Sequence, residues 1–94
     1  MSTDANAKKE KIRLYIREIA GRRQNVTLTE IEWVVNQLKG HCTVSVVAND
    51  HQRVYSIDGI RFGVCTHRSG GKQIKAVYVK EFLRVMTETG WYED

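Results

Sequence analysis

A two-residue turn between β-rich segments is the feature that most constrains the fold of this chain. Residues 53–66, RVYSIDGIRFGVCT, place Asp58-Gly59 between two runs rich in β-branched and aromatic side chains. This pair favours a type I′ hairpin, in which both turn residues have positive φ. The turn sets the register and predicts that facing residues share one side of the sheet, which helices should cover: Ile57 with Ile60, Tyr55 with Phe62, Arg53 with Val64 and His51 with Thr66.

Helical periodicity flanks this hairpin on both sides. Residues 8–20 have apolar side chains at i, i+3, i+4 and i+7, which indicates an amphipathic helix with a basic outer face. Thr27 and Glu30 form a capping box at the start of a second helix over 27–39. A third helix is predicted over 77–89, where an apolar stripe ends before a glycine.

Between the second helix and the hairpin, the segment HCTVSVV, residues 41–47, is predicted to be a strand. The expected order is therefore α-α-β-β-β-α. This order predicts an α+β fold, with a three-stranded antiparallel sheet and helices packed on one face.

The charge of the chain is concentrated in two segments. The 94 residues carry a net charge of +4, and residues 1–26 supply all of it with seven basic and three acidic residues. From Gly59 to Lys80 there are five basic residues and no acid. Such segments attract phosphate groups, although each taken alone is more often a solvated surface.

The remaining composition narrows the class of protein. No apolar run approaches the roughly 18 residues that a membrane span needs, and the N-terminus lacks the pattern of a secretory signal, so a cytoplasmic protein is expected. Two cysteines are too few for a disulfide framework, and free thiols are expected. A zinc site built from His41, Cys42, Cys65 and His67 is disfavoured, because adjacent strand residues point to opposite faces. No cofactor or metal is therefore expected.

Four stretches in order carry a family resemblance: LTEIEWVVNQLKG (28–40), DHQRVYSIDGIRF (50–62), THRSGGKQIK (66–75) and KAVYVKEFLRVMTETGW (75–91). From about Asn25 onward the sequence resembles the HicA toxins, small mRNA interferases of toxin-antitoxin pairs. The resemblance implies a fold like the double-stranded RNA-binding domain (dsRBD). It divides the chain into a basic helical extension, 1–26, and a HicA-like domain, 27–94.

The resemblance also implies a catalytic residue and a partner. His51 falls on the single catalytic histidine of the family, and a HicB-like antitoxin would cover it. Asn49 and Asp50 stand where the family has glycine and serine. Asp50 could orient His51 and raise its pKa, or repel RNA.

The residue types suit RNA cleavage without a metal. RNA carries its own nucleophile, the 2′-hydroxyl, and a histidine can act as general acid or base near neutral pH. Basic side chains would hold the phosphate and offset its growing charge. The predicted RNA-binding residues are Arg53, His67, Arg68, Lys72, Lys75 and Lys80.

Two other functions are open at this stage. One is a non-catalytic RNA-binding module of the same fold, which Asn49 and Asp50 favour. The other is a protein-interaction domain whose basic first helix meets an acidic partner. A steep salt dependence of RNA affinity would distinguish RNA binding from the protein-interaction domain.

Overall fold

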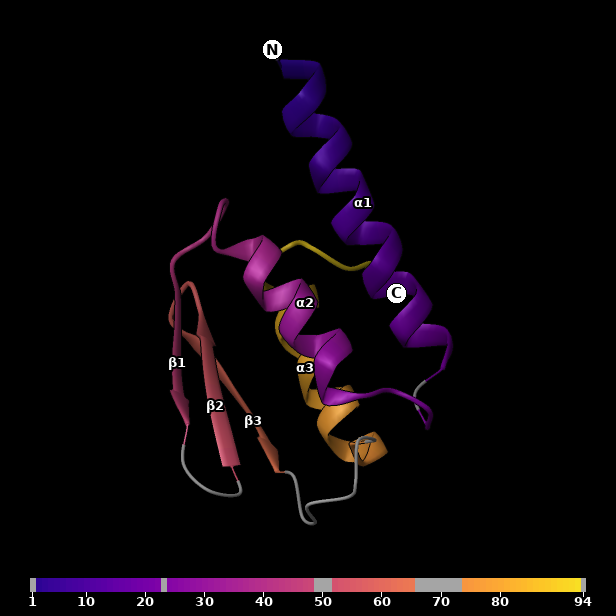
Figure 1. The fold of residues 1–94 in the computed structure, drawn as a ribbon, viewed down its shortest axis with the longest axis vertical. Coiled ribbons are helices and arrows are strands. Elements are labelled where there is room, and N and C mark those ends of the chain that lie inside the picture. Colours follow the sequence, from indigo (N-terminus) through magenta and orange to yellow (C-terminus); the bar gives the residue numbers. More distant parts are fainter. Residues whose placement is uncertain (1, 23, 49–51, 66–73, 94) are drawn as a thin grey trace.

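The computed structural model describes residues 2–22, 24–48, 52–65 and 74–93. The predicted α+β class and the order α-α-β-β-β-α are confirmed, and the strands form an antiparallel sheet in the order β1-β2-β3. All three helices lie on one side of this sheet (Figure 1). The elements are α1 (Ser2–Gly21), α2 (Leu28–Leu38), β1 (Val44–Ala48), β2 (Gln52–Ile57), β3 (Ile60–Cys65) and α3 (Ala76–Glu88).

The hairpin between β2 and β3 forms as predicted. Asp58 and Gly59 have φ values of 50° and 87°, which fits the turn that their sequence favours. The register pairs Ile57 with Ile60, Tyr55 with Phe62 and Arg53 with Val64, as expected. The predicted pair of His51 and Thr66 lies outside the described residues. The inward face of the hairpin is apolar, and its buried members are Tyr55, Ile57, Phe62 and Val64.

The predicted start of the first strand at His41 is wrong, because the end of α2 uses that segment. The N–H groups of His41 and Cys42 both donate to the carbonyl of Leu38, at 2.9 and 2.8 Å. The strand begins only after Thr43, whose carbonyl accepts from the N–H of Asp58 at 2.8 Å. The strand then runs through Ala48, one residue further than predicted.

The capping box of α2 is present. Thr27 Oγ1 accepts from the N–H of Glu30 at 3.3 Å, and Glu30 Oε1 accepts from the N–H of Thr27 at 3.0 Å. Arg22 also donates to the Glu30 carboxylate. This hydrogen bond, opposed by burial, lowers the pKa of Glu30. The box thus joins the end of α1 to the start of α2.

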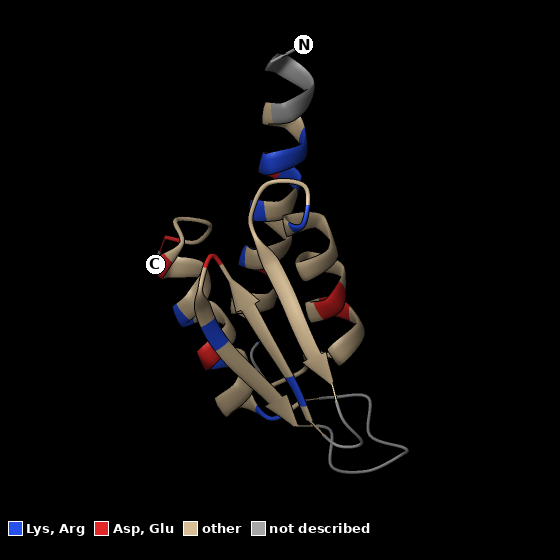
Figure 2. Cartoon of the chain, turned by 90° about the vertical axis from the view of Figure 1, so that its left-hand side faces the viewer, with Lys and Arg blue, Asp and Glu red and all other residues tan. Residues whose placement is uncertain are grey.

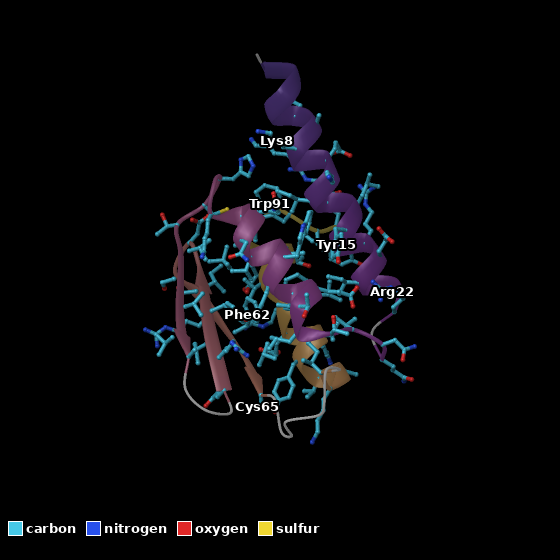
Figure 3. All side chains as sticks on the ribbon, viewed as in Figure 1. Lys8, Tyr15, Arg22, Phe62, Cys65 and Trp91 are labelled. Carbon is cyan, nitrogen blue, oxygen red and sulfur yellow. The ribbon has the colours of Figure 1, made fainter. Side chains whose placement is uncertain are left out.

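Helix α1 begins earlier than predicted and belongs to the main core. It extends to Ser2, and its isoleucines at 12, 16 and 19 are buried in one cluster with α2, α3 and the sheet. The Tyr15 ring stacks on the Trp33 ring of α2 with 4.4 Å between centroids, and Figure 3 shows Tyr15 between these helices. Helix α1 therefore supplies one wall of the hydrophobic core.

Candidate nucleic-acid interface

The predicted site residues divide into two groups. His51, Asp50, His67, Arg68 and Lys72 lie outside the described residues. Arg53, Lys75 and Lys80 lie within the described residues.

One end of the sheet gathers the strand termini that flank the predicted site. Ala48, the last residue of β1, pairs with Arg53 near the start of β2, and Gln52 pairs with Cys65 at the end of β3. In the sequence, His51 immediately precedes Gln52, and the basic segment 66–73 immediately follows Cys65. The hairpin turn at Asp58 lies at the opposite end of the sheet (Figure 1).

The start of α3 is held at the same end of the sheet. Helix α3 packs against β3, and the neighbouring Cys65 thiol, at the end of that strand, raises the pKa of Tyr78. Ile74 is buried, and its N–H donates to the Val26 carbonyl at 2.9 Å. Cys65 and Ile74, which flank segment 66–73 in the sequence, are therefore both held by contacts with the rest of the fold. Figure 3 shows Cys65 at this end.

Arg53 lies on the inward face of β2 but keeps part of its side chain in solvent. Its Nε is 3.6 Å from Glu32 Oε2 of α2, and 35% of the side chain is exposed. An exposed pair of this kind contributes at most about 1 kcal/mol, so the contact orients the guanidinium without strongly holding it. The terminal nitrogens form no hydrogen bond with the described residues and can bind phosphate.

Lys75 and Lys80 lie at the beginning of α3, and both are exposed. Lys75 is the N-cap residue, its own side chain makes no capping hydrogen bond, and the first turn contains no acidic residue. The unpaired N–H groups and the positive end of the helix dipole favour an anion here. Lys75 adds a full charge at the same place. Lys80 is further along the helix and extends the basic surface.

The outward face of the sheet carries a basic residue that the sequence-based site did not include. Arg61 lies there with Ser45, Val47, Val54 and Ser56, and these five residues line a shallow hollow of about 290 Å³. The only charged residues in the three strands are Arg53 and Arg61. Figure 2 views this open face, which no helix covers. The period-two alternation of β3 could have placed Arg61 outward from sequence alone.

The aromatic and cysteine residues at the other end of the molecule serve packing. Trp91 is 7% exposed, its Nε1 donates to Cys42 Sγ at 3.2 Å, and the guanidinium of Arg13 lies 5.4 Å from its ring centroid. Burial raises the pKa of the Cys42 thiol and so keeps it protonated. His41 lies 5.6 Å from Trp91 between ring centroids. Within the described ranges, no cluster of three or more potential metal ligands occurs.

Comparisons of the chain with protein-family models, with characterised proteins and with solved structures found no match. In the parts of the chain that the structure describes, no helix has both the length and the apolar character needed to cross a membrane.

Proposed function

We propose that this chain is an RNA-binding endonuclease of the toxin type, an mRNA interferase that acts in the cytoplasm. The observation that carries the proposal is the arrangement at one end of the sheet. At this end β2 begins, directly after His51 in the sequence, and β3 ends, directly before the basic segment 66–73. Helix α3 starts there too, after its exposed N-cap residue Lys75. The order α-β-β-β-α after α1 is also the order that the HicA resemblance implies.

In the proposed reaction, the nucleophile comes from the substrate. His51 accepts the proton of a ribose 2′-hydroxyl, whose oxygen attacks the adjacent phosphorus. The bond from phosphorus to the 5′-oxygen of the next nucleotide breaks, and that oxygen takes up a proton. The products are a 2′,3′-cyclic phosphate and a free 5′-hydroxyl. Arg53 and Lys75, with the predicted contacts His67, Arg68, Lys72 and Lys80, bind the phosphates and offset the charge that develops.

The proposal includes a protein partner. A HicB-like antitoxin would restrain the toxin by covering His51 and the basic residues around it. The second candidate function is a non-catalytic RNA-binding module of the same fold. Asn49 and Asp50 favour this alternative, because the glycine and serine that the resemblance implies before the catalytic histidine are absent.

The test is expression in a bacterial host of wild type, His51→Ala and the matched control His41→Ala. His41 contacts Trp91 near the end of α2, away from the proposed site. Wild type and His41→Ala are expected to arrest growth and degrade mRNA, whereas His51→Ala is expected to do neither. Intact mRNA with all three proteins present at equal levels would reject the endonuclease and leave the RNA-binding module.

A further inference from the structure

The two edge strands of the sheet, β1 and β3, differ in the contacts that they make with the rest of the chain. The β3 edge is protected, because Arg84 Nη2 of α3 donates to the carbonyl of Arg61 at 3.3 Å and α3 packs along this strand. The β1 edge has no such protection. Among the described residues, no side chain or backbone group hydrogen-bonds to the outward groups of β1.

The hydrogen-bond pattern identifies the free groups of β1. The Thr43 carbonyl accepts from the N–H of Asp58, so Thr43 directs its backbone groups toward β2. Alternate residues of an antiparallel strand direct these groups to opposite sides. Ser45 and Val47 therefore also bond to β2, while the N–H and C=O groups of Val44, Val46 and Ala48 point away from the sheet.

The side chains of β1 favour association. The strand reads VSVVA and contains neither a charged residue nor a proline. These are the residues that most often prevent two edge strands from pairing. Val46 on the inward face is 41% exposed, and Val47 on the outward face is 68% exposed. A strand added at this edge would cover both valines and supply partners for the three outward peptide groups.

Helix α2 presents a charge pattern beside this strand. A groove of about 210 Å³ separates the helix from β1 and is lined by Val46 and Tyr55 of the sheet, by Glu32, Val35 and Asn36 of α2, and by Lys39, the C-cap residue of this helix. Glu32, Asn36 and Lys39 are spaced to form one stripe along the helix. The stripe is negative at one end, where Glu32 also lies 3.6 Å from Arg53 of β2, and positive at the other, with Val46 alongside.

We propose that β1 is a homodimer interface, in which a second copy of this chain adds its own β1 antiparallel about a twofold axis at Val46. Val46 then faces Val46 of the second copy, and Val44 faces its Ala48. These are the residues with free backbone groups, so the ladder is satisfied across the axis and the two sheets become one six-stranded sheet.

The charges on α2 select a second copy as the partner. A twofold axis near Val46 makes the two α2 helices antiparallel, which brings Glu32 toward Lys39 of the second copy and Lys39 toward its Glu32. Opposite charges therefore meet at both ends of the stripe. The contact comprises one short strand and one helix stripe. An interface of that size is small, and a dissociation constant on the order of micromolar is expected.

The test is sedimentation velocity of the full chain at pH 7 from about 5 to 500 µM, ordinary working concentrations for a micromolar equilibrium. Wild type is expected to shift from 10.8 kDa to twice that mass. Val46→Lys places two ammonium groups at the axis and is expected to remain a monomer. Val77→Lys is the matched control, because Val77 of α3 is 57% exposed and distant from β1 in the fold, and this variant is expected to dimerise like wild type.

A charge exchange tests the register. Lys39→Glu should weaken the dimer by about tenfold or more, because it places two carboxylates opposite each other at both ends of the stripe. The double variant Glu32→Lys, Lys39→Glu should recover most of the affinity, with circular dichroism confirming that both variants are folded. A wild type that stays monomeric would overturn the proposal and leave the edge to a strand of another protein. Dimers unaffected by Val46→Lys, or not rescued by the double variant, would also overturn it.

Discussion

Removal of one oxygen atom from the core is expected to stabilise this protein. The Tyr55 side chain is 2% exposed, and its hydroxyl is buried without a hydrogen-bond partner among the described residues. Its ring stacks on Phe62 with 5.1 Å between centroids. Tyr55→Phe keeps this ring contact and removes a group whose unpaired burial costs about 1–3 kcal/mol. The variant also loses the van der Waals contacts of this oxygen, so the net gain in the free energy of unfolding is expected to be about 1 kcal/mol.

Urea denaturation followed by circular dichroism measures this change at pH 7. Tyr78→Phe is the matched control, because it removes the same oxygen atom from a partly exposed position, and no comparable gain in stability is expected. A Tyr55→Phe variant that is less stable than wild type by about 1 kcal/mol or more would refute the reasoning, since the hydroxyl would then have a favourable partner.

The same residue gives the protein an alkaline pH dependence. Burial raises the pKa of Tyr55 to about 12 in the folded chain, compared with 10.0 for an ordinary tyrosine. The unfolded chain therefore releases this proton first as the pH rises, and wild type loses stability between these two values. Tyr55→Phe has no such proton, so its advantage over wild type should grow above about pH 10. An advantage that stays constant with pH would contradict the burial of this hydroxyl.

Three further predictions concern α1, the capping box and the basic segment. Ile16→Ala should lower the free energy of unfolding by about 3 kcal/mol in urea denaturation. Leu14→Ala, at a 52% exposed position of the same helix, should change it by less than about 0.5 kcal/mol, and equal effects would place α1 outside the core. Glu30→Gln should lower the free energy of unfolding by about 1 kcal/mol at pH 7. Because the pKa of Glu30 is lowered in the folded state, the difference in stability from wild type should shrink below about pH 4. A difference in stability that does not depend on pH would contradict the role of the charge. Replacing Lys72 and Lys75 by alanine should lower the salt slope of RNA affinity by about 1 for each phosphate that the variant no longer binds, and an unchanged slope would exclude both lysines as phosphate ligands.

The elements that could be predicted are those with strong local signals. Asp58-Gly59 defines both the turn and the register, since only a few residue pairs tolerate positive φ at both positions. Thr27 and Glu30 likewise locate the N-cap of α2, although the helix itself, Leu28–Leu38, is one residue shorter at each end than the predicted range 27–39. In both cases a short stretch of sequence contains all the groups that form the structure.

The features that could not be predicted depend on contacts distant in sequence or on backbone groups alone. The start of β1 is displaced because His41 and Cys42 bond to Leu38, and backbone bonds of this kind have no sequence signature. Periodicity showed that α1 has an apolar face, but only the fold shows that the face packs on α2 and α3. The difference between the β1 and β3 edges depends on Arg84, which is 23 residues from Arg61.

The most direct test of the proposed function uses purified protein, EDTA and two oligonucleotides of one sequence. One is RNA, and the other is its 2′-deoxy equivalent, which lacks the proposed nucleophile. Wild type is expected to cleave only the RNA, leaving a 2′,3′-cyclic phosphate, and His51→Ala is expected to cleave neither. Equal cleavage of the RNA by wild type and His51→Ala, or cleavage of the 2′-deoxy strand, would contradict the proposed role of His51.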